Sequence, residues 1–286
     1  MSRTLSRGLL AAGIGGYAAS CVAESRRLEI RGAPVNSCAE AMPQLADAGY
    51  AIIQDCVPQS VLCSCEATQA FRGMPKSAAE RQSEHWKLTA LGRFHRVHFC
   101  ESDQRTFEQL EPIFEPIVEA FFREQTGLGS KPDGGSSVER KIYRSELQLL
   151  TATPTHSQSQ SWHADNVARG ITIIVPLVDF SIENGATQIL PGSHRLLASF
   201  FRLLADGPRV ITPRAGSIAV YDARLYHRGL GNATASSRPA LVFRYDFEET
   251  PPPGVGIAGS VANIGLAKVL HAGTGAGAAL REALFG

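Results

Sequence analysis

Residues 162–177 read Trp-His-Ala-Asp-Asn-Val-Ala-Arg-Gly-Ile-Thr-Ile-Ile-Val-Pro-Leu, and this stretch decides the fold. Its second half, Gly170 to Leu177, is a nearly continuous apolar and β-branched run, which is typical of a buried strand. Its first half carries His163 and Asp165 with one residue between them. Because residues i and i+2 of an extended strand point to the same side, both side chains are predicted to reach one metal ion.

Two later segments extend this pattern, Tyr226-His227 and Ser237-Arg238-Pro239. Two imidazoles and one carboxylate hold one face of a divalent metal and leave the other positions open, as a non-heme Fe(II) oxygenase requires. His163, Asp165 and His227 are therefore the candidate metal ligands. A guanidinium is a rigid fork that fits a carboxylate, so Arg238 is the candidate for binding an acid cosubstrate. Arg244 is the alternative, because it has the same strand parity.

Five sequence elements occur in a fixed order, and together they resemble the phytanoyl-CoA dioxygenase family of Fe(II)/2-oxoglutarate-dependent oxygenases. The resemblance covers roughly Pro34 to Phe247. The five elements are His163-Ala-Asp165, the Asn184-Gly185 segment, Pro191-Gly-Ser-His194, His227, and Arg238 eleven residues after it.

The resemblance implies a mainly β fold with a helical flank. The expected core is a double-stranded β-helix, a jelly-roll or cupin-like barrel, with N-terminal helices packed outside and iron at one mouth. It also implies a dioxygenase that uses Fe(II), O2 and 2-oxoglutarate, with ascorbate as an optional reductant. Such an enzyme releases succinate and CO2 while hydroxylating a small molecule. Related halogenases have a small residue in place of the carboxylate, so Asp165 favours oxygen transfer.

Other functions use the same residues and stay open at this point. Desaturation, epoxidation or ring rearrangement of a secondary metabolite needs the same ligands, and a metal-bearing barrel could also bind a ligand without oxidising it. Gln148, on the strand before His163, is a candidate contact for cosubstrate or substrate, and a solvent-facing glutamine is the alternative. His194 is interpreted as structural. His95 and His98 lie in a segment that could cover the barrel mouth.

Hydrophobic periodicity predicts the elements around the site. The helix predicted over Thr106–Thr126 contains Pro112 and Pro116, so a kink or a restart is expected there. The strands predicted are Gly49–Gln54, Ile142–Leu150, Gly170–Leu177, Ser217–Tyr221 and Pro239–Phe247, and the other helices are Ala39–Ala48, Pro58–Arg72 and Leu196–Ala205.

The 286 residues suit one catalytic domain over 35–250, followed by a Gly/Ala-rich tail over 251–286. Residues 1–34 contain arginine and serine but no acid until Glu24, which fits a mitochondrial or plastid transit peptide. A secretory signal and a disordered terminus are the alternatives. All six cysteines precede residue 101, before the metal-site motifs, and show no regular pairing pattern, which favours an intracellular, reducing compartment, with the cytoplasm as default.

The formal net charge is +1, from 28 basic and 27 acidic side chains, so no basic excess points to a nucleic-acid partner. The apolar stretch near the start, Leu9 to Tyr17, is too short and too rich in glycine for a membrane span. The expected partner is a small-molecule substrate. Sequence gives no indication of the oligomeric state.

Overall fold

The structure is a computed structural model. It describes residues 34–67, 86–88, 93–96, 99, 101–126, 140–154, 157–160, 162–195, 208–248 and 250. Apart from Pro34, the predicted targeting segment lies outside the described residues. So do the C-terminal tail, the predicted helix Leu196–Ala205 and His98.

Four helices and ten strands make up the described part of the chain. The helices are α2 (Cys38–Ala48), α3 (Gln59–Ala67), α5 (Glu101–Glu108) and α6 (Glu111–Thr126). The strands are β1 (Tyr50–Ile53), β2 (Trp86–Leu88), β3 (Arg93–Arg96), β4 (Ile142–Ala152), β5 (Ile171–Pro176), β6 (Thr187–Ile189), β7 (Arg209–Ile211), β8 (Ile218–Asp222), β9 (His227–Gly229) and β10 (Arg238–Phe247).

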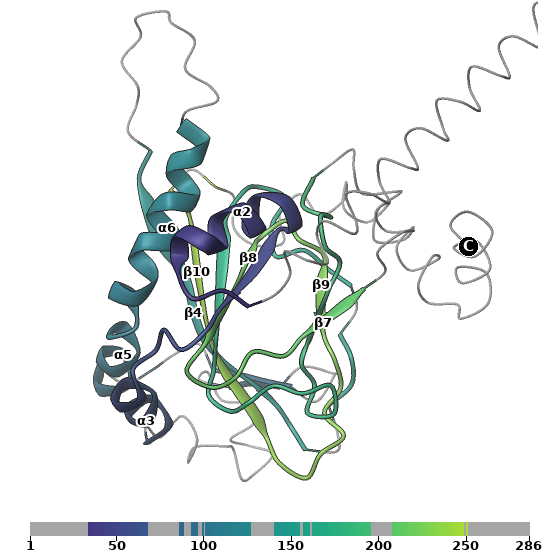
Figure 1. The fold of residues 1–286 in the computed structure, drawn as a ribbon. Helices are drawn as coiled ribbons and strands as arrows, with labels where there is room; N and C mark the ends of the chain where they lie inside the picture. Colours follow the sequence, from purple (N-terminus) through teal and green to yellow (C-terminus); the bar gives the residue numbers. More distant parts are fainter. Residues whose placement is uncertain are drawn as a thin grey trace, which may run out of the picture.

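The strands form two antiparallel sheets. The larger sheet has the order β1-β8-β5-β10-β4-β3-β2, and the smaller sheet has the order β7-β6-β9. The labelled strands β7 and β9 lie on the side of the molecule away from α5 and α6 (Figure 1). The prediction of a mainly β fold is confirmed.

Alternation along β10 separates the two faces of the larger sheet. Leu241 and Phe243 pack into a hydrophobic core that also contains Phe114 and Ile117 of α6. Phe114 and Phe243 meet edge to face, with ring centroids 4.9 Å apart. On the opposite face, Ala240 and Val242 join a second core with residues of β6 and β7. One face of the sheet therefore packs on α6, and the other faces the smaller sheet.

Local sequence sets the ends of α2. The Ser37 hydroxyl accepts a hydrogen bond from the Glu40 backbone N–H (3.3 Å), so Ser37 caps the helix start. Gly49 ends the helix at φ 82°, the left-handed conformation that glycine adopts without strain. A Cβ at Gly49 would lie 2.4 Å from Nδ1 of His194, so this close approach also requires glycine.

The structure confirms the restart expected at Pro112, because α5 ends at Glu108 and α6 begins at Glu111. It corrects two details of the sequence prediction. The short strands β2, β3, β6, β7 and β9 were not predicted. His163 does not lie in a strand, because it forms a single antiparallel bridge with His227, and Asp165 lies in a bend.

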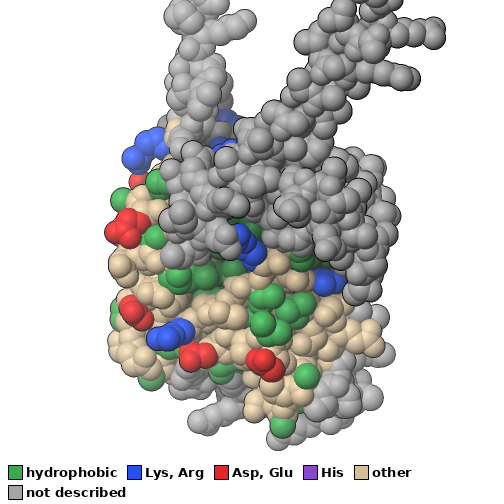
Figure 2. All heavy atoms as spheres, turned by 45° about the vertical axis from the view of Figure 1, so that its right-hand side comes forward, with side chains coloured by type: hydrophobic (Ala, Val, Ile, Leu, Met, Phe, Trp, Pro, Cys, Tyr) green, Lys and Arg blue, Asp and Glu red, His purple; other side chains and the backbone are tan. Residues whose placement is uncertain are grey.

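Acidic and basic side chains are interspersed with apolar and uncharged ones on the described surface facing the viewer in Figure 2. Among the described helices, none combines the length and the apolar character needed to cross a membrane.

Candidate metal centre

The structure brings His163, Asp165 and His227 together, with one donor atom of each within 4.8 Å of the others. The backbones of His163 and His227 exchange two hydrogen bonds, of 3.0 and 2.9 Å, which fix the two imidazoles side by side. Asn166 then turns the chain, because its side-chain oxygen accepts from the N–H groups of Val167 and Ala168. This turn, and not a strand, holds Asp165 next to the two histidines.

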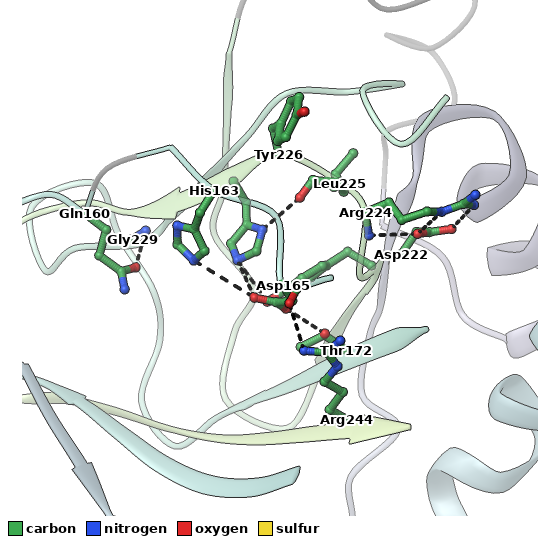
Figure 3. Close-up of polar contacts among 12 residues, drawn as sticks. Gln160, His163, Asp165, Thr172, Asp222, Arg224, Leu225, Tyr226, Gly229 and Arg244 are labelled. Atoms are coloured by element: carbon green, nitrogen blue, oxygen red, sulfur yellow. Dashed lines mark hydrogen bonds and ion pairs between the residues drawn. The ribbon is translucent and has the colours of Figure 1, made fainter. Parts of the chain in front are cut away.

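A backbone carbonyl orients the His227 ring. Nδ1 of His227 lies 2.9 Å from the Leu225 carbonyl oxygen, which can only accept, so Nδ1 carries the proton. Nε2 is then left with its lone pair, 3.4 Å from Oδ1 of Asp165. Nε2 of His163 lies 4.0 Å from the same oxygen (Figure 3). A metal ligand histidine is commonly held by its second nitrogen in this way.

The larger sheet holds the Asp165 carboxylate. Thr172 of β5 donates its hydroxyl to Oδ2 at 2.8 Å, which leaves Oδ1 facing the two histidines. Arg244 of β10 approaches from the same side and donates Nη1 to the Asp165 carbonyl oxygen at 3.3 Å (Figure 3). The hydroxyl of Tyr221, on β8, lies 3.3 Å from Nε2 of His227. Thr172, Arg244 and Tyr221 thus support the metal ligands from the larger sheet, opposite β9.

The electrostatic environment favours the protonation states that metal binding needs. Burial lowers the pKa of His227 to about 4, although the charge of Asp165 opposes the shift. Burial alone would raise the pKa of Asp165, but His227, His163, Arg244 and the Thr172 hydroxyl together hold it below its usual value. At neutral pH His227 is thus neutral and Asp165 ionised.

A cavity of about 320 Å³ opens beside the three donor atoms. Strand alternation explains one wall of this cavity, because every second residue of β4 and β10 faces it. The cavity is lined by Arg93, Glu146, Gln148, Leu150, Gln160, His163, Ala164, Asp165, Ile174, Thr187, Tyr221, His227, Gly229, Arg238, Ala240, Val242 and Arg244.

Both candidate arginines line this cavity, but their surroundings differ. Nε of Arg244 lies 2.9 Å from Oδ2 of Asp246, and both side chains are almost fully buried. Arg238 is 2% exposed, and its guanidinium lies over the Phe180 ring, 4.5 Å from the centroid. Nε of either arginine makes no hydrogen bond among the described residues, but only that of Arg244 has a carboxylate oxygen beside it. Arg244 thus has an ion-pair partner in Asp246, and Arg238 has none among the described residues.

The remaining predicted residues are placed as follows. Gln148 of β4 lines the cavity and is only half buried. His194 is buried away from it, with Nε2 at 3.3 Å from the Ala46 carbonyl oxygen. Asn184 holds a turn, because its side chain accepts from the Ser181 N–H and donates to the Asp179 carbonyl. The side chain of His95 lies outside the described part of the molecule.

Sequence reasoning missed several residues of the site. Among them, Thr172 and Tyr221 contact a candidate metal ligand, and Glu146 and Arg93 line the cavity. Strand parity could have suggested Glu146, two residues before Gln148 on β4. Thr172 lies inside a β-branched run that was predicted as a strand, and nothing in the sequence indicated a further role for it in the site.

The residues present fit a non-heme iron site. The donor set is two imidazoles and one carboxylate, and all three side chains line the same cavity. Each ligand has its own supporting contact, from Leu225, Thr172 or the backbone bridge.

Three solved structures that share the fold of this chain are each 17 to 18% identical to it. AviO1 from Streptomyces viridochromogenes Tue57 aligns over 77% of this chain and 100% of its own, with a TM-score of 0.60. The non-heme alpha-ketoglutarate dependent epimerase SnoN of nogalamycin biosynthesis aligns over 77% of this chain and 87% of its own, with a TM-score of 0.56. The carbocyclase SnoK of the same biosynthesis aligns over 81% of this chain and 94% of its own, with a TM-score of 0.53.

The sequence pattern of one protein family matches residues 45–240, well over half of the chain, and this match includes the metal site and Arg238. The chain belongs to the phytanoyl-CoA dioxygenase (PhyH) family.

Proposed function

We propose that the protein is an Fe(II)- and 2-oxoglutarate-dependent dioxygenase that hydroxylates a small molecule and releases succinate and CO2. One observation carries the proposal: three metal-type donor atoms share a cavity with a buried arginine that has no described acid partner. We also propose that the two sheets are the halves of a double-stranded β-helix. The backbone bridge between His163 and His227, which leads into β9, supports this arrangement.

In this proposal Nε2 of His163, Oδ1 of Asp165 and Nε2 of His227 hold Fe(II). The bound iron would supply dioxygen activation and a chelation position for the keto acid. Thr172 and the Leu225 carbonyl keep the carboxylate and the His227 ring in place before iron arrives. Preorganised ligands bind a metal more tightly because less motion is lost on binding.

Arg238 binds the distal carboxylate of 2-oxoglutarate in the same proposal. Its guanidinium is held against Phe180 and lies at the start of β10, in the cavity that the metal ligands share. A buried cation in a region of low dielectric attracts an anion strongly. Leu150, Ala240 and Val242 form an apolar wall between the ends of the cavity, which favours exclusion of water from the bound acid.

Gln148 and Glu146 are the proposed polar contacts for the substrate or the keto acid. Both line the cavity from β4, and Glu146 lies opposite Arg244 in the strand register. Burial raises the pKa of the Glu146 carboxyl, with the charge of Asp165 adding to the effect. A cavity of about 320 Å³ fits a small molecule, at the lower end of typical ligand pockets.

The first test is an anaerobic titration of the protein with Fe(II) and 2-oxoglutarate, followed by visible spectroscopy. A weak charge-transfer band of the keto-acid chelate is expected in wild type and should be absent in His163→Ala. If well-folded, iron-loaded wild type forms no band, the dioxygenase proposal is wrong, and a barrel that only binds a ligand becomes the better explanation. Oxygen exposure with a substrate panel should then also yield no succinate.

A second candidate function of the same site is a reaction other than hydroxylation. SnoN is an epimerase and SnoK a carbocyclase, so this fold supports outcomes in which no hydroxyl is added. Product mass separates the candidates once a substrate is found. Hydroxylation adds one oxygen atom, desaturation and ring closure each remove two hydrogens, and epimerisation leaves the mass unchanged.

A further inference from the structure

A second arginine lines the metal cavity beside Arg238. Arg93 begins β3, and its side chain is 0% exposed although arginine is almost never fully buried without a specific reason. It lines the same cavity as His163, Asp165 and Arg238. Neither the metal ligands nor the groups that orient them account for its position.

Strand register places the two arginines in one row. Arg93 of β3 and Arg238 of β10 both pair with Ala152 of β4, from opposite sides. Residues directly opposite each other in antiparallel strands point to the same face of the sheet. Because the residue between them is alanine, no large side chain separates the two guanidiniums. Both therefore project into the same end of the cavity.

The guanidinium of Arg93 is held in place by backbone next to the metal ligand. Its Nη2 donates to the carbonyl oxygens of Leu230 and, at 3.4 Å, of Gln158. A Cβ at Gly229, two residues after His227, would lie only 3.0 Å from Cζ and Nη1 of Arg93. The Gly229 N–H is in turn bound by Oε1 of Gln160 at 2.8 Å (Figure 3). Because Gly229 has no side chain, the guanidinium of Arg93 can occupy the space beside it.

The two positive charges act on each other inside the protein. Burial lowers the pKa of Arg93 to about 10. Burial, and then the charge of Arg93, lower the pKa of Arg238 to about 9. The acids that line the cavity, Glu146 and Asp165, both interact with Arg244. Two like charges in a poorly solvated site repel, and a bound anion relieves that repulsion.

We propose that Arg93 and Arg238 together bind the distal carboxylate of 2-oxoglutarate, so that the site selects a dicarboxylic 2-oxo acid over a monocarboxylic one. A carboxylate has lone pairs enough to accept from two guanidiniums at once. This inference rests on the proposed function and adds a second binding residue to it.

Equilibrium binding tests the proposal without turnover. Calorimetric titration of the anaerobic Fe(II)-loaded protein would compare 2-oxoglutarate with 2-oxopentanoate, which lacks the distal carboxylate. In Arg93→Met, 2-oxoglutarate should bind about ten- to hundredfold more weakly, the usual effect of losing a charge-assisted hydrogen bond, and 2-oxopentanoate should be unaffected. Arg228→Met is the matched control, because Arg228 lies over Trp162 and binds Gln188 outside the cavity.

Gly229→Ala gives a second route to the same guanidinium. The added methyl group would lie 2.8 Å from Oε1 of Gln160 and 3.0 Å from the Arg93 guanidinium, and would displace Arg93 without removing its charge. We expect 2-oxoglutarate to lose more affinity than 2-oxopentanoate, because only 2-oxoglutarate has the distal carboxylate. This variant decides the question if Arg93→Met does not fold.

Three results would overturn the proposal. Unchanged 2-oxoglutarate affinity in a folded Arg93→Met shows that Arg93 does not contact the acid. Equal losses for both keto acids indicate a general distortion of the site. If wild type binds neither keto acid, the proposed function itself fails, and the role of Arg93 fails with it.

Discussion

At the scale of single residues, Thr172 shows how one hydroxyl prepares a metal ligand. It donates to Oδ2 of Asp165 at 2.8 Å and is 1% exposed. We expect Thr172→Val to weaken Fe(II) binding by about tenfold, because ligands lose affinity when the group that orients them is removed. Metal titration of the anaerobic protein measures this. Thr151→Val is the control, since Thr151 is buried on β4 of the same sheet but does not line the cavity.

If both threonine variants bind Fe(II) as tightly as wild type, the Thr172 hydroxyl has no orienting role. If both lose affinity equally, the loss reflects packing of the sheet.

The two arginines of β10 should respond differently to removal. Arg244→Met leaves the buried carboxylate of Asp246 without its ion-pair partner, which typically costs about 3–5 kcal/mol of unfolding free energy. Arg238→Met removes no described ion pair, so its main effect should be a loss of 2-oxoglutarate affinity. Urea denaturation and keto-acid titration of both variants separate these effects. If Arg238→Met lost stability and Arg244→Met lost 2-oxoglutarate affinity instead, the roles assigned to the two residues would have to be exchanged.

Sequence was sufficient for the residues that chemistry constrains most. His163, Asp165, His227 and Arg238 stand in recognisable order, and the structure brings them to one cavity. Arg93 could not be predicted in the same way. It lies 70 residues before His163, and only the shared register with Ala152 puts it beside Arg238. Register across three strands is a tertiary property, which no local pattern in this chain encodes.

At the scale of elements, every strand that the sequence predicted has four or more residues, and none of the three-residue strands was predicted. The strands β4, β5 and β10 contain six or more residues, enough for a β-branched or alternating pattern to be recognised. The strand β9 contains only His227, Arg228 and Gly229, and its composition carries no strand signal. Its backbone is fixed by pairing with β6 and with His163. The strand β9, which carries the candidate ligand His227, could therefore not be predicted from its own sequence.

The loop that contains His194 makes stability depend on pH. Burial against the end of α2 lowers the pKa of His194 from 6.5 to about 4. Between these values the unfolded chain binds a proton that the folded protein does not, so the unfolding free energy falls as the pH falls. From neutral pH to about pH 5 this single group should contribute a loss of about 2 kcal/mol. Well above pH 6.5 the histidine is deprotonated in both states, and its contribution no longer changes.

Urea denaturation of the metal-free protein at both pH values measures this effect. His194→Gln should show a smaller loss between them, because glutamine does not titrate. The difference isolates His194 from the buried His227, which also has a lowered pKa and is present in both proteins. Identical pH dependence in the two proteins would contradict the burial argument for His194.

At the scale of the whole molecule, the metal site joins the two sheets. His227 belongs to the smaller sheet, and the Thr172 hydroxyl that holds Asp165 belongs to the larger one. His163 bridges to β9, and its own segment leads directly into β5. A metal at this position therefore links elements that otherwise meet through the second hydrophobic core.

Metal binding should accordingly stabilise the fold as a whole. A ligand that binds only the folded state raises the unfolding free energy by about 2.7 kcal/mol at a hundredfold excess over its dissociation constant. Thermal unfolding of anaerobic wild type with and without Fe(II) measures the gain, and His163→Ala should show much less of it. Hydrogen exchange then locates the gain, because protection should rise in both β9 and β5. Protection confined to one sheet would show that the metal does not link the two.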